Sequence, residues 1–296
     1  MKKRKEKKVG TKKLILTESQ MELLRGSLLE MRLRTYIFDW DDNILYMPTT
    51  IKMDKKEGNE WVPVDVPTDE FAHVRSDANY RLRDNNPTLA FKDFKDSEPF
   101  IVDTKKAIHG AKFGPSFDKF KEALIHANPF AINTARGHKP EVLRDGVRLF
   151  IDMVFSDEQK SEMAKNIKEL LNQTKSLTDD QAIDFYLDEM GEYYPVSSDE
   201  FGERFGLEVT GGAANPEHAK KVAIEHFVRK IFKNVQTLVS SDYKKMSVGF
   251  SDDDLKNVRA VEQFIEEELN KMYPEFHFVV YDTSDKGKRK MVIEKE

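Results

Sequence analysis

The stretch "TYIFDWDDNILYM" (Thr35 to Met47) places a short apolar run directly before a cluster of acids. Residues 36–38 indicate a buried β-strand. Within five positions the strand is followed by Asp39, Asp41, Asp42 and Asn43. Carboxylates this close repel one another and resist removal from water, so a core strand that ends in them needs a compensating partner.

The composition indicates a soluble globular protein with one large domain, or a core domain with an insertion. The chain has 296 residues, 39% of them hydrophobic and 34% charged, and a net charge of -5. No run of eighteen apolar residues occurs, so we expect no membrane span. The acidic balance argues against a dedicated nucleic-acid binder. The absence of cysteine excludes disulfides and thiolate metal sites, and we expect a cytoplasmic protein.

The first thirteen residues, "MKKRKEKKVGTKK", carry eight Lys or Arg. They lack the apolar segment of a secretory signal. Runs of like charge usually stay disordered, so residues 1–13 are interpreted as a solvated basic tail. The alternative is a contact between this tail and the phosphate backbone of a nucleic acid.

Strands and helices alternate along the rest of the chain. We expect helices over about 18–32, 117–127 and from 139 onward, further helices in the second half, and a hairpin over about 50–66. Strands are expected at 35–39, 130–133, 246–250 and 276–282. Residues 68–100 are interpreted as irregular, and the stretch from Tyr193 to about 215 as a connection. This order predicts an α/β fold with a parallel sheet covered on both faces.

Three of the expected strands, at 35–39, 130–133 and 246–250, end in polar residues. In open α/β sheets, ligands bind outside the carboxyl ends of the strands. We therefore expect the three strand ends to meet in one crevice. Asp39 at the first end is a candidate nucleophile or Mg²⁺ ligand, and Asp41 is a candidate proton donor and acceptor. An Asx-turn or a helix cap is the alternative for both.

The other strand ends carry groups that suit a phosphate. Thr134 can hydrogen-bond a phosphoryl oxygen, and Arg136 can pair with phosphate. Lys220 or Lys221, at the start of a helix, can neutralise charge on a transferring phosphoryl group. Capping by the threonine and a solvated helix face for the lysines are the simpler alternatives. The last acidic strand end carries Asp252, Asp253 and Asp254.

The order and spacing of these residues resemble the haloacid dehalogenase (HAD) superfamily of phosphohydrolases. The four motifs of that family correspond here to "YIFDWDDN", "FAINTARG", "HAKKVAI" and "SVGFSDDD", which span about residues 35–260. Asn43 departs from the family pattern, in which Thr or Val is usual at that position. The resemblance implies a Rossmann-like three-layer α/β fold with cap-type insertions.

The resemblance also implies roles for individual residues. Asp39 would be the nucleophile that forms an aspartyl-phosphate, and Asp41 the general acid/base whose backbone carbonyl also contacts Mg²⁺. Thr134 would bind the phosphoryl group, and Lys220, with Lys221 as the alternative, would hold Asp39 and the phosphate charge in place. Asp252 would complete the Mg²⁺ site with Asp253 beside it, although which of the three neighbouring acids contacts the metal stays open.

The expected organisation follows from the motifs. The HAD-like core would comprise residues 14–49, 116–150 and 213–296. Residues 50–115 would form a hairpin and loop cap, and residues 151–212 a mostly helical insertion. Side chains that could contact a substrate there are Arg75, Arg81, Arg83, Trp61, Tyr193 and Tyr194, although packing is the simpler role for the aromatic ones.

The resulting hypothesis is a Mg²⁺-dependent phosphatase that acts through an aspartyl-phosphate on a small phosphorylated metabolite or nucleotide. The first alternative is a nucleic-acid-end phosphatase, suggested by the basic tail and the arginines of the first insertion. The second is a non-catalytic binding protein with a HAD-like fold, which the intact Asp39 and Asp41 argue against.

Overall fold

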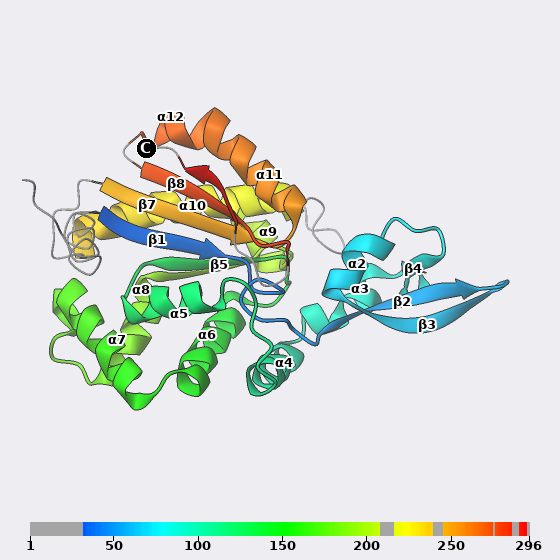
Figure 1. The fold of residues 1–296 in the computed structure, drawn as a ribbon, viewed down its shortest axis with the longest axis horizontal. Coiled ribbons are helices and arrows are strands. Elements are labelled where there is room, and N and C mark those ends of the chain that lie inside the picture. The colour runs from blue at the N-terminus through cyan, green and yellow to red at the C-terminus, as the bar shows by residue number, and fades with distance from the viewer. Residues whose placement is uncertain (1–31, 208–215, 239–244, 275, 286–289, 295–296) are drawn as a thin grey trace, which may run out of the picture.

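The computed structural model describes residues 32–207, 216–238, 245–274, 276–285 and 290–294. Its main sheet has the strand order β6-β5-β1-β7-β8-β9 (Figure 1). The strands are β1 (Arg32–Phe38), β5 (Phe130–Thr134), β6 (Gly191–Pro195), β7 (Lys245–Asp252), β8 (Phe276–Asp282) and β9 (Lys290–Glu294). The first five strands in this order are parallel, and β9 is antiparallel to β8. The predicted parallel α/β sheet is therefore confirmed.

The apolar strands alternate their side chains between two buried cores, because successive residues of a strand point to opposite faces. Tyr36 and Phe38 of β1 join one core, whereas Ile37 joins the other. The first face is covered by α4 (Ser97–His109), α5 (Phe117–Ile125), α6 (Pro140–Val154), α7 (Asp157–Leu170) and α8 (Asp179–Glu189). The second is covered by α9 (Asp199–Phe205), α10 (Pro216–Leu238) and α11 (Leu255–Phe264). A π-helical turn at Ile265–Leu269 leads into the short α12 (Asn270–Met272).

Residues 50–96, here called the small lobe, form a separate sheet beside the carboxyl ends of the main strands (Figure 1). Its elements are β2 (Thr50–Glu57), β3 (Glu60–Pro67), α2 (Thr68–Val74), β4 (Tyr80–Leu82) and α3 (Pro87–Ala90), with 3-10 turns at Arg83–Asn85 and Lys92–Phe94. The hairpin predicted over 50–66 is confirmed, with Gly58 at a positive φ of 63° in its turn. The lobe has a small core of its own, formed by Ile51, Met53, Val66 and Ala90.

Residues 68–100 were interpreted as irregular, and this expectation is wrong. Two short helices, a short strand and the start of α4 lie in this range. These elements are too short and too polar to show a clear hydrophobic period. Their local signals are side-chain caps, such as Asn86, whose side chain accepts hydrogen bonds from the backbone of Thr88 and Leu89.

Residues 151–212 were expected to be an insertion, but the structure incorporates the described part of this range, residues 151–207, into the main fold. The turn-rich stretch around Tyr193 and Tyr194 is part of β6, which pairs in parallel with β5. Tyr194 is buried in the second core, and Tyr193 packs against the first. These tyrosines therefore pack within the protein and do not line a ligand site. The expected helix over 18–32 and the tail over 1–13 lie outside the described residues, apart from Arg32 in β1.

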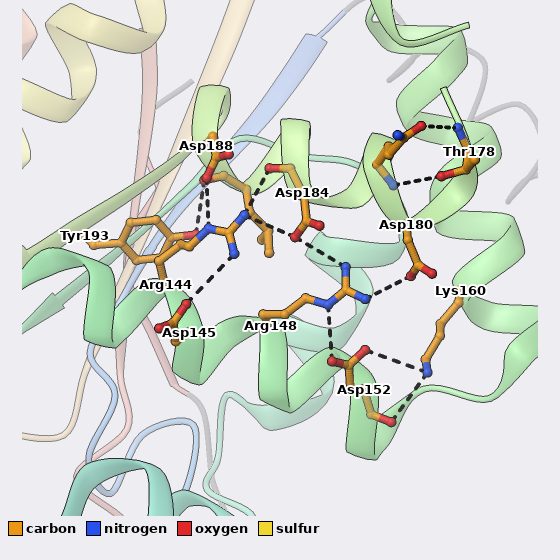
Figure 2. A network of polar contacts seen from close by, with 12 residues as sticks. Arg144, Asp145, Arg148, Asp152, Lys160, Thr178, Asp180, Asp184, Asp188 and Tyr193 are labelled. Carbon is orange, nitrogen blue, oxygen red and sulfur yellow. Dashed lines mark hydrogen bonds and ion pairs between the residues drawn. The ribbon is translucent and has the colours of Figure 1, made fainter. Parts of the chain in front are cut away.

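Salt bridges fix α8 against α6 (Figure 2). Arg144 Nε lies 2.8 Å from Asp188 Oδ1, and Arg148 Nη2 lies 2.8 Å from Asp180 Oδ1. Asp184 contacts both guanidinium groups. Such pairs at the surface each contribute little, but a network of planar guanidinium groups sets how two helices align. No helix among the described residues is long and apolar enough to cross a membrane.

Gly146 allows α4 to pack closely against α6. A β-carbon at this position would lie 2.5 Å from Cε1 of the buried Phe100. We therefore expect Gly146→Ala to lower the free energy of unfolding by about 1–2 kcal/mol, because the steric cost exceeds the helix-propensity gain of about 1 kcal/mol. Urea unfolding measures this, with Ser161→Ala on the exposed side of α7 as the control expected to cause no loss. An equal or higher stability of Gly146→Ala would contradict this packing.

Candidate active site

The carboxyl ends of three neighbouring strands bring together residues that are distant in sequence. In the sheet β1 lies between β5 and β7, with Phe38 opposite both Ile132 and Ser251. The residues that follow or end these strands are Asp39, Thr134 and Asp252, and all three are buried. The strand order changes direction at β1, which is where α/β sheets open a binding crevice. The predicted meeting of the three polar strand ends is present.

Lys220 joins two of these strand ends. Its ammonium, only 2% exposed, lies 3.0 Å from Asp39 Oδ1 and 2.6 Å from Asp252 Oδ2. Burial alone would lower the pKa of Lys220, but the two carboxylates outweigh burial and raise it, so the lysine is charged. Its carbonyl accepts a hydrogen bond from Asn133 Nδ2, which fixes the start of α10 on β5. Lys221, the sequence alternative, places its ammonium 5.8 Å from the ring centroid of Phe264.

The three acids after β7 occupy different environments. Asp252 has both oxygens engaged, because Oδ2 accepts from Lys220 and Oδ1 from Asn257 and the backbone N–H of Asp254. Asp254 caps α11 by accepting from the backbone N–H of Lys256. Asp253 lies between them in sequence and within electrostatic reach of Asp39. The three acids therefore differ in their contacts. Asp252 holds Lys220, Asp254 caps α11, and Asp253 interacts electrostatically with Asp39 and Asp252.

Two of the carboxylates are destabilised in their charged form. Burial raises the pKa of Asp39 well above its usual value; Lys220 opposes this, and the charges of Asp252 and Asp41 add to it. Burial likewise raises the pKa of Asp253, with further increases from Asp39 and Asp252. In both cases removal from water is the largest cause of the raised pKa, and the neighbouring negative charges add to it.

Asp41 lies on the other side of the site, in contact with β5. Its Oδ1 lies 2.7 Å from Arg136 Nη2 and its Oδ2 lies 2.8 Å from Arg136 Nε, so the pair is bidentate. The hydroxyl of Thr134 lies 3.4 Å from Oδ2 of Asp41 and accepts a hydrogen bond from the backbone N–H of Arg136. Thr134 and Asp41 are therefore neighbours, as the sequence interpretation requires.

Arg136 occupies a different place from the one predicted. We expected its guanidinium to contact phosphate, but the side chain is only 1% exposed. It pairs with Asp41 and donates to Thr49 Oγ1 at 2.9 Å. Because these contacts engage it within the protein, we assign Arg136 to the placement of Asp41 rather than to phosphate binding.

Asn43 connects the strand ends beneath the acids. Its amide donates to the backbone carbonyls of Asp39 at 3.0 Å and of Ser251 at 3.2 Å. Its Oδ1 accepts from the hydroxyl of Thr283, which follows β8. The sequence gave no sign of the partners Ser251 and Thr283, because they are more than 200 positions away. This buried amide holds the ends of β1, β7 and β8 together.

The small lobe also contacts the site. Thr68, the first residue of α2, donates a hydrogen bond of 2.6 Å to Oδ2 of Asp42. Two arginines of the lobe serve its own sheet: Arg81 pairs with Asp54 and stacks on Trp61, and Arg83 donates to backbone carbonyls. Arg75, the third arginine of the lobe, is exposed. Trp61 is thus partly covered by Arg81. The lobe thus contacts the site through Thr68 and Asp42, while Arg81 and Arg83 are engaged within the lobe.

The charges of the cluster fit a divalent cation. If ionised, Asp39, Asp252 and Asp253 carry three negative charges against one positive charge on Lys220, which leaves two negative charges. No group of three His, Cys, Asp or Glu side chains suited to a metal occurs in the part of the chain that the structure describes. Mg²⁺ commonly uses only one or two carboxylates, completed by water and substrate phosphate. Asp39 and Asp253 are two carboxylates of the cluster that influence each other electrostatically.

Comparison with known proteins adds no relative. No family model, no curated protein and no solved structure matches the chain.

The hydrogen bonds of Asn43 predict a large stability effect. Asn43→Ala would leave buried carbonyl and hydroxyl groups without partners, at about 1–3 kcal/mol for each group. We expect a loss of about 2–4 kcal/mol in unfolding free energy by urea titration. Asn43→Asp should be at least as harmful, because a carboxylate oxygen would face two carbonyl oxygens. The control is Asn79→Ala, whose exposed side chain bonds only to Asp77. Equal effects at both sites would contradict the assignment.

Proposed function

We propose that the protein is a Mg²⁺-dependent phosphatase that acts through an aspartyl-phosphate on a small phosphorylated metabolite or nucleotide. The observation that carries the proposal is the contact of Lys220 with both Asp39 and Asp252, in a crevice that also contains Thr134 and Asp41. The chain order of these residues resembles that of HAD phosphohydrolases. Phosphoryl transfer depends mainly on positioning and electrostatic stabilisation, and both are available at this crevice.

In the first step Asp39 attacks the phosphorus atom, an acyl phosphate forms on its carboxylate, and the bond to the leaving oxygen breaks. Asp41 donates a proton to that oxygen. In the second step Asp41 takes a proton from water, which attacks the acyl phosphate and releases inorganic phosphate and free Asp39. Thr134 hydrogen-bonds the phosphoryl oxygens. Lys220 keeps Asp39 in place and offsets the negative charge of the transferring group.

Asp39, Asp253 and the backbone carbonyl of Asp41 would hold the Mg²⁺ ion. When bound, the ion supplies positive charge that reduces repulsion between the carboxylate nucleophile and the phosphate. In this arrangement Asp252 serves mainly to fix Lys220. This division of roles accounts for three consecutive acids at one strand end, of which the sequence left the metal ligand open.

Two alternatives remain as proposals of lower rank. A nucleic-acid-end phosphatase is favoured by the eight basic residues among the first thirteen, which lie outside the described residues. A non-catalytic binding protein would need no nucleophile, and the burial of Asp39 beside Lys220 argues against it.

We expect the purified protein to hydrolyse p-nitrophenyl phosphate with Mg²⁺ and to lose this activity after treatment with EDTA. Asp39→Asn should reduce the rate by at least roughly 10³-fold, because the nucleophile is absent. Asp118→Asn, an exposed acid on α5, is the matched control and should retain full activity. Rapid acid quench should recover hydroxylamine-labile phosphate on the wild-type protein. Metal-independent hydrolysis, or an active Asp39→Asn variant, would reject the proposal.

A substrate panel separates the phosphatase alternatives. We expect nucleotides or sugar phosphates to be hydrolysed faster than 3′- or 5′-phosphorylated oligonucleotides, since Arg81 and Arg83 of the small lobe are engaged within its own sheet. The opposite ranking, together with loss of oligonucleotide hydrolysis after removal of residues 1–13, would favour the nucleic-acid-end phosphatase.

A further inference from the structure

Arg136 has contacts that the proposed reaction does not use directly. We propose that Arg136 is a positioning residue that holds Asp41 in the orientation for proton transfer, and that the residues flanking and ending the small lobe set the place of its guanidinium. This inference rests on the proposed function, because it assigns a positioning role to a residue of the same site. It goes beyond that function by linking the proton donor to the lobe.

The guanidinium is fixed in both direction and plane. Its bidentate pair with Asp41 has N···O distances of 2.7 and 2.8 Å. Its central carbon lies 4.8 Å from the ring centroid of Phe94 and 5.0 Å from that of Phe100. A bidentate guanidinium determines the orientation of a carboxylate, and the aromatic rings determine the plane of the guanidinium. A lysine ammonium, as a point charge, provides neither.

Arg136 and the residue after it contact the two ends of the small lobe. Nη2 donates to the hydroxyl of Thr49, the residue before β2, and Thr49 in turn donates to Asp103 Oδ2 at 2.9 Å. At the other end of the lobe, the carbonyl of Phe94 accepts from the backbone N–H of Gly137. A displacement of the lobe would therefore move the partners that set the position of Arg136.

His138 also contacts Arg136, and it does not compete with Arg136 for Asp41. Its Nε2 lies 3.3 Å from Arg136 Nη1. Burial, together with the adjacent charge of Arg136, lowers the pKa of His138 to about 4, so the neutral imidazole can accept a hydrogen bond. Thus the positive charge beside Asp41 is that of the arginine.

The test compares two leaving groups. Proton donation matters more for phenyl phosphate than for p-nitrophenyl phosphate, because phenolate is the poorer leaving group. We expect Arg136→Lys to reduce kcat/KM for phenyl phosphate about 10-fold to 100-fold more than for p-nitrophenyl phosphate. Asp41→Asn should show the same selectivity, and the double variant should lose little more than Asp41→Asn alone. Arg148→Lys, at a paired arginine remote from the site, is the control expected to lose nothing on either substrate.

A second variant covers the case in which Arg136→Lys does not fold. Thr49→Val preserves shape but removes the hydroxyl that accepts from Arg136, and we expect a smaller loss that is again selective for phenyl phosphate. An equal loss on both substrates, or a change confined to KM, would indicate a phosphate contact or a general structural role and would overturn the inference. A wild type without phosphatase activity would overturn the proposed function and this inference together, whereas an active wild type with a non-selective variant overturns the inference alone.

Discussion

The architecture of the site depends on one ammonium group shared by two buried carboxylates. Asp39 and Asp252 follow or end adjacent strands, and the ammonium of Lys220 lies within hydrogen-bond distance of both carboxylates. A buried ion pair is weak support for stability, since desolvation offsets much of the attraction. The presence of this ion pair is better explained by a function of its charges than by a contribution to stability. Were Asp39, Asp252 and Asp253 all ionised, the cluster would keep two negative charges beside Lys220, and this excess is what supports the proposed cation site.

The sheet supplies the geometry that this interaction requires. Only the order β5-β1-β7 places all three strand ends side by side, and α10 must then begin at β5 for Lys220 to reach the acids. Asn43 holds the ends of β1 and β7 at a fixed separation from below. The like charges are thus kept together by neutral hydrogen bonds from the Asn43 side chain to backbone carbonyls. The site is rigid because its acids follow buried strands and not because they attract one another.

Part of this arrangement could be predicted from sequence. Apolar strands ending in Asp39, Thr134 and Asp252 identify one edge of a parallel sheet, since the chemistry and the strand direction are both local signals. The role of Arg136 could not be predicted, because its aromatic neighbours and hydroxyl partner lie some 40 to 90 positions upstream. Strand β6 was missed because its tyrosines, glycine and proline resemble a turn until β5 is available to pair with them. The local sequence pattern thus identifies the residues of the site, whereas their contact partners are set by tertiary packing.

The two buried cations divide the acids into two environments. Lys220 serves a cluster that remains negative, and the pKa of Asp39 is raised there by burial. Arg136 forms a one-to-one ion pair with Asp41, whose carboxylate lacks a contact with Lys220 among the described residues. Separating the environments of two carboxylates is the general means by which one becomes a nucleophile and the other a proton carrier. Because the second pair is enclosed by Phe94 and Thr49 at the two ends of the small lobe, the lobe is connected to the proton carrier and not to the nucleophile. In the proposed mechanism, this connection would let the lobe influence leaving-group departure rather than attack, and the lobe would then be the part of the fold placed to select substrates by their leaving group.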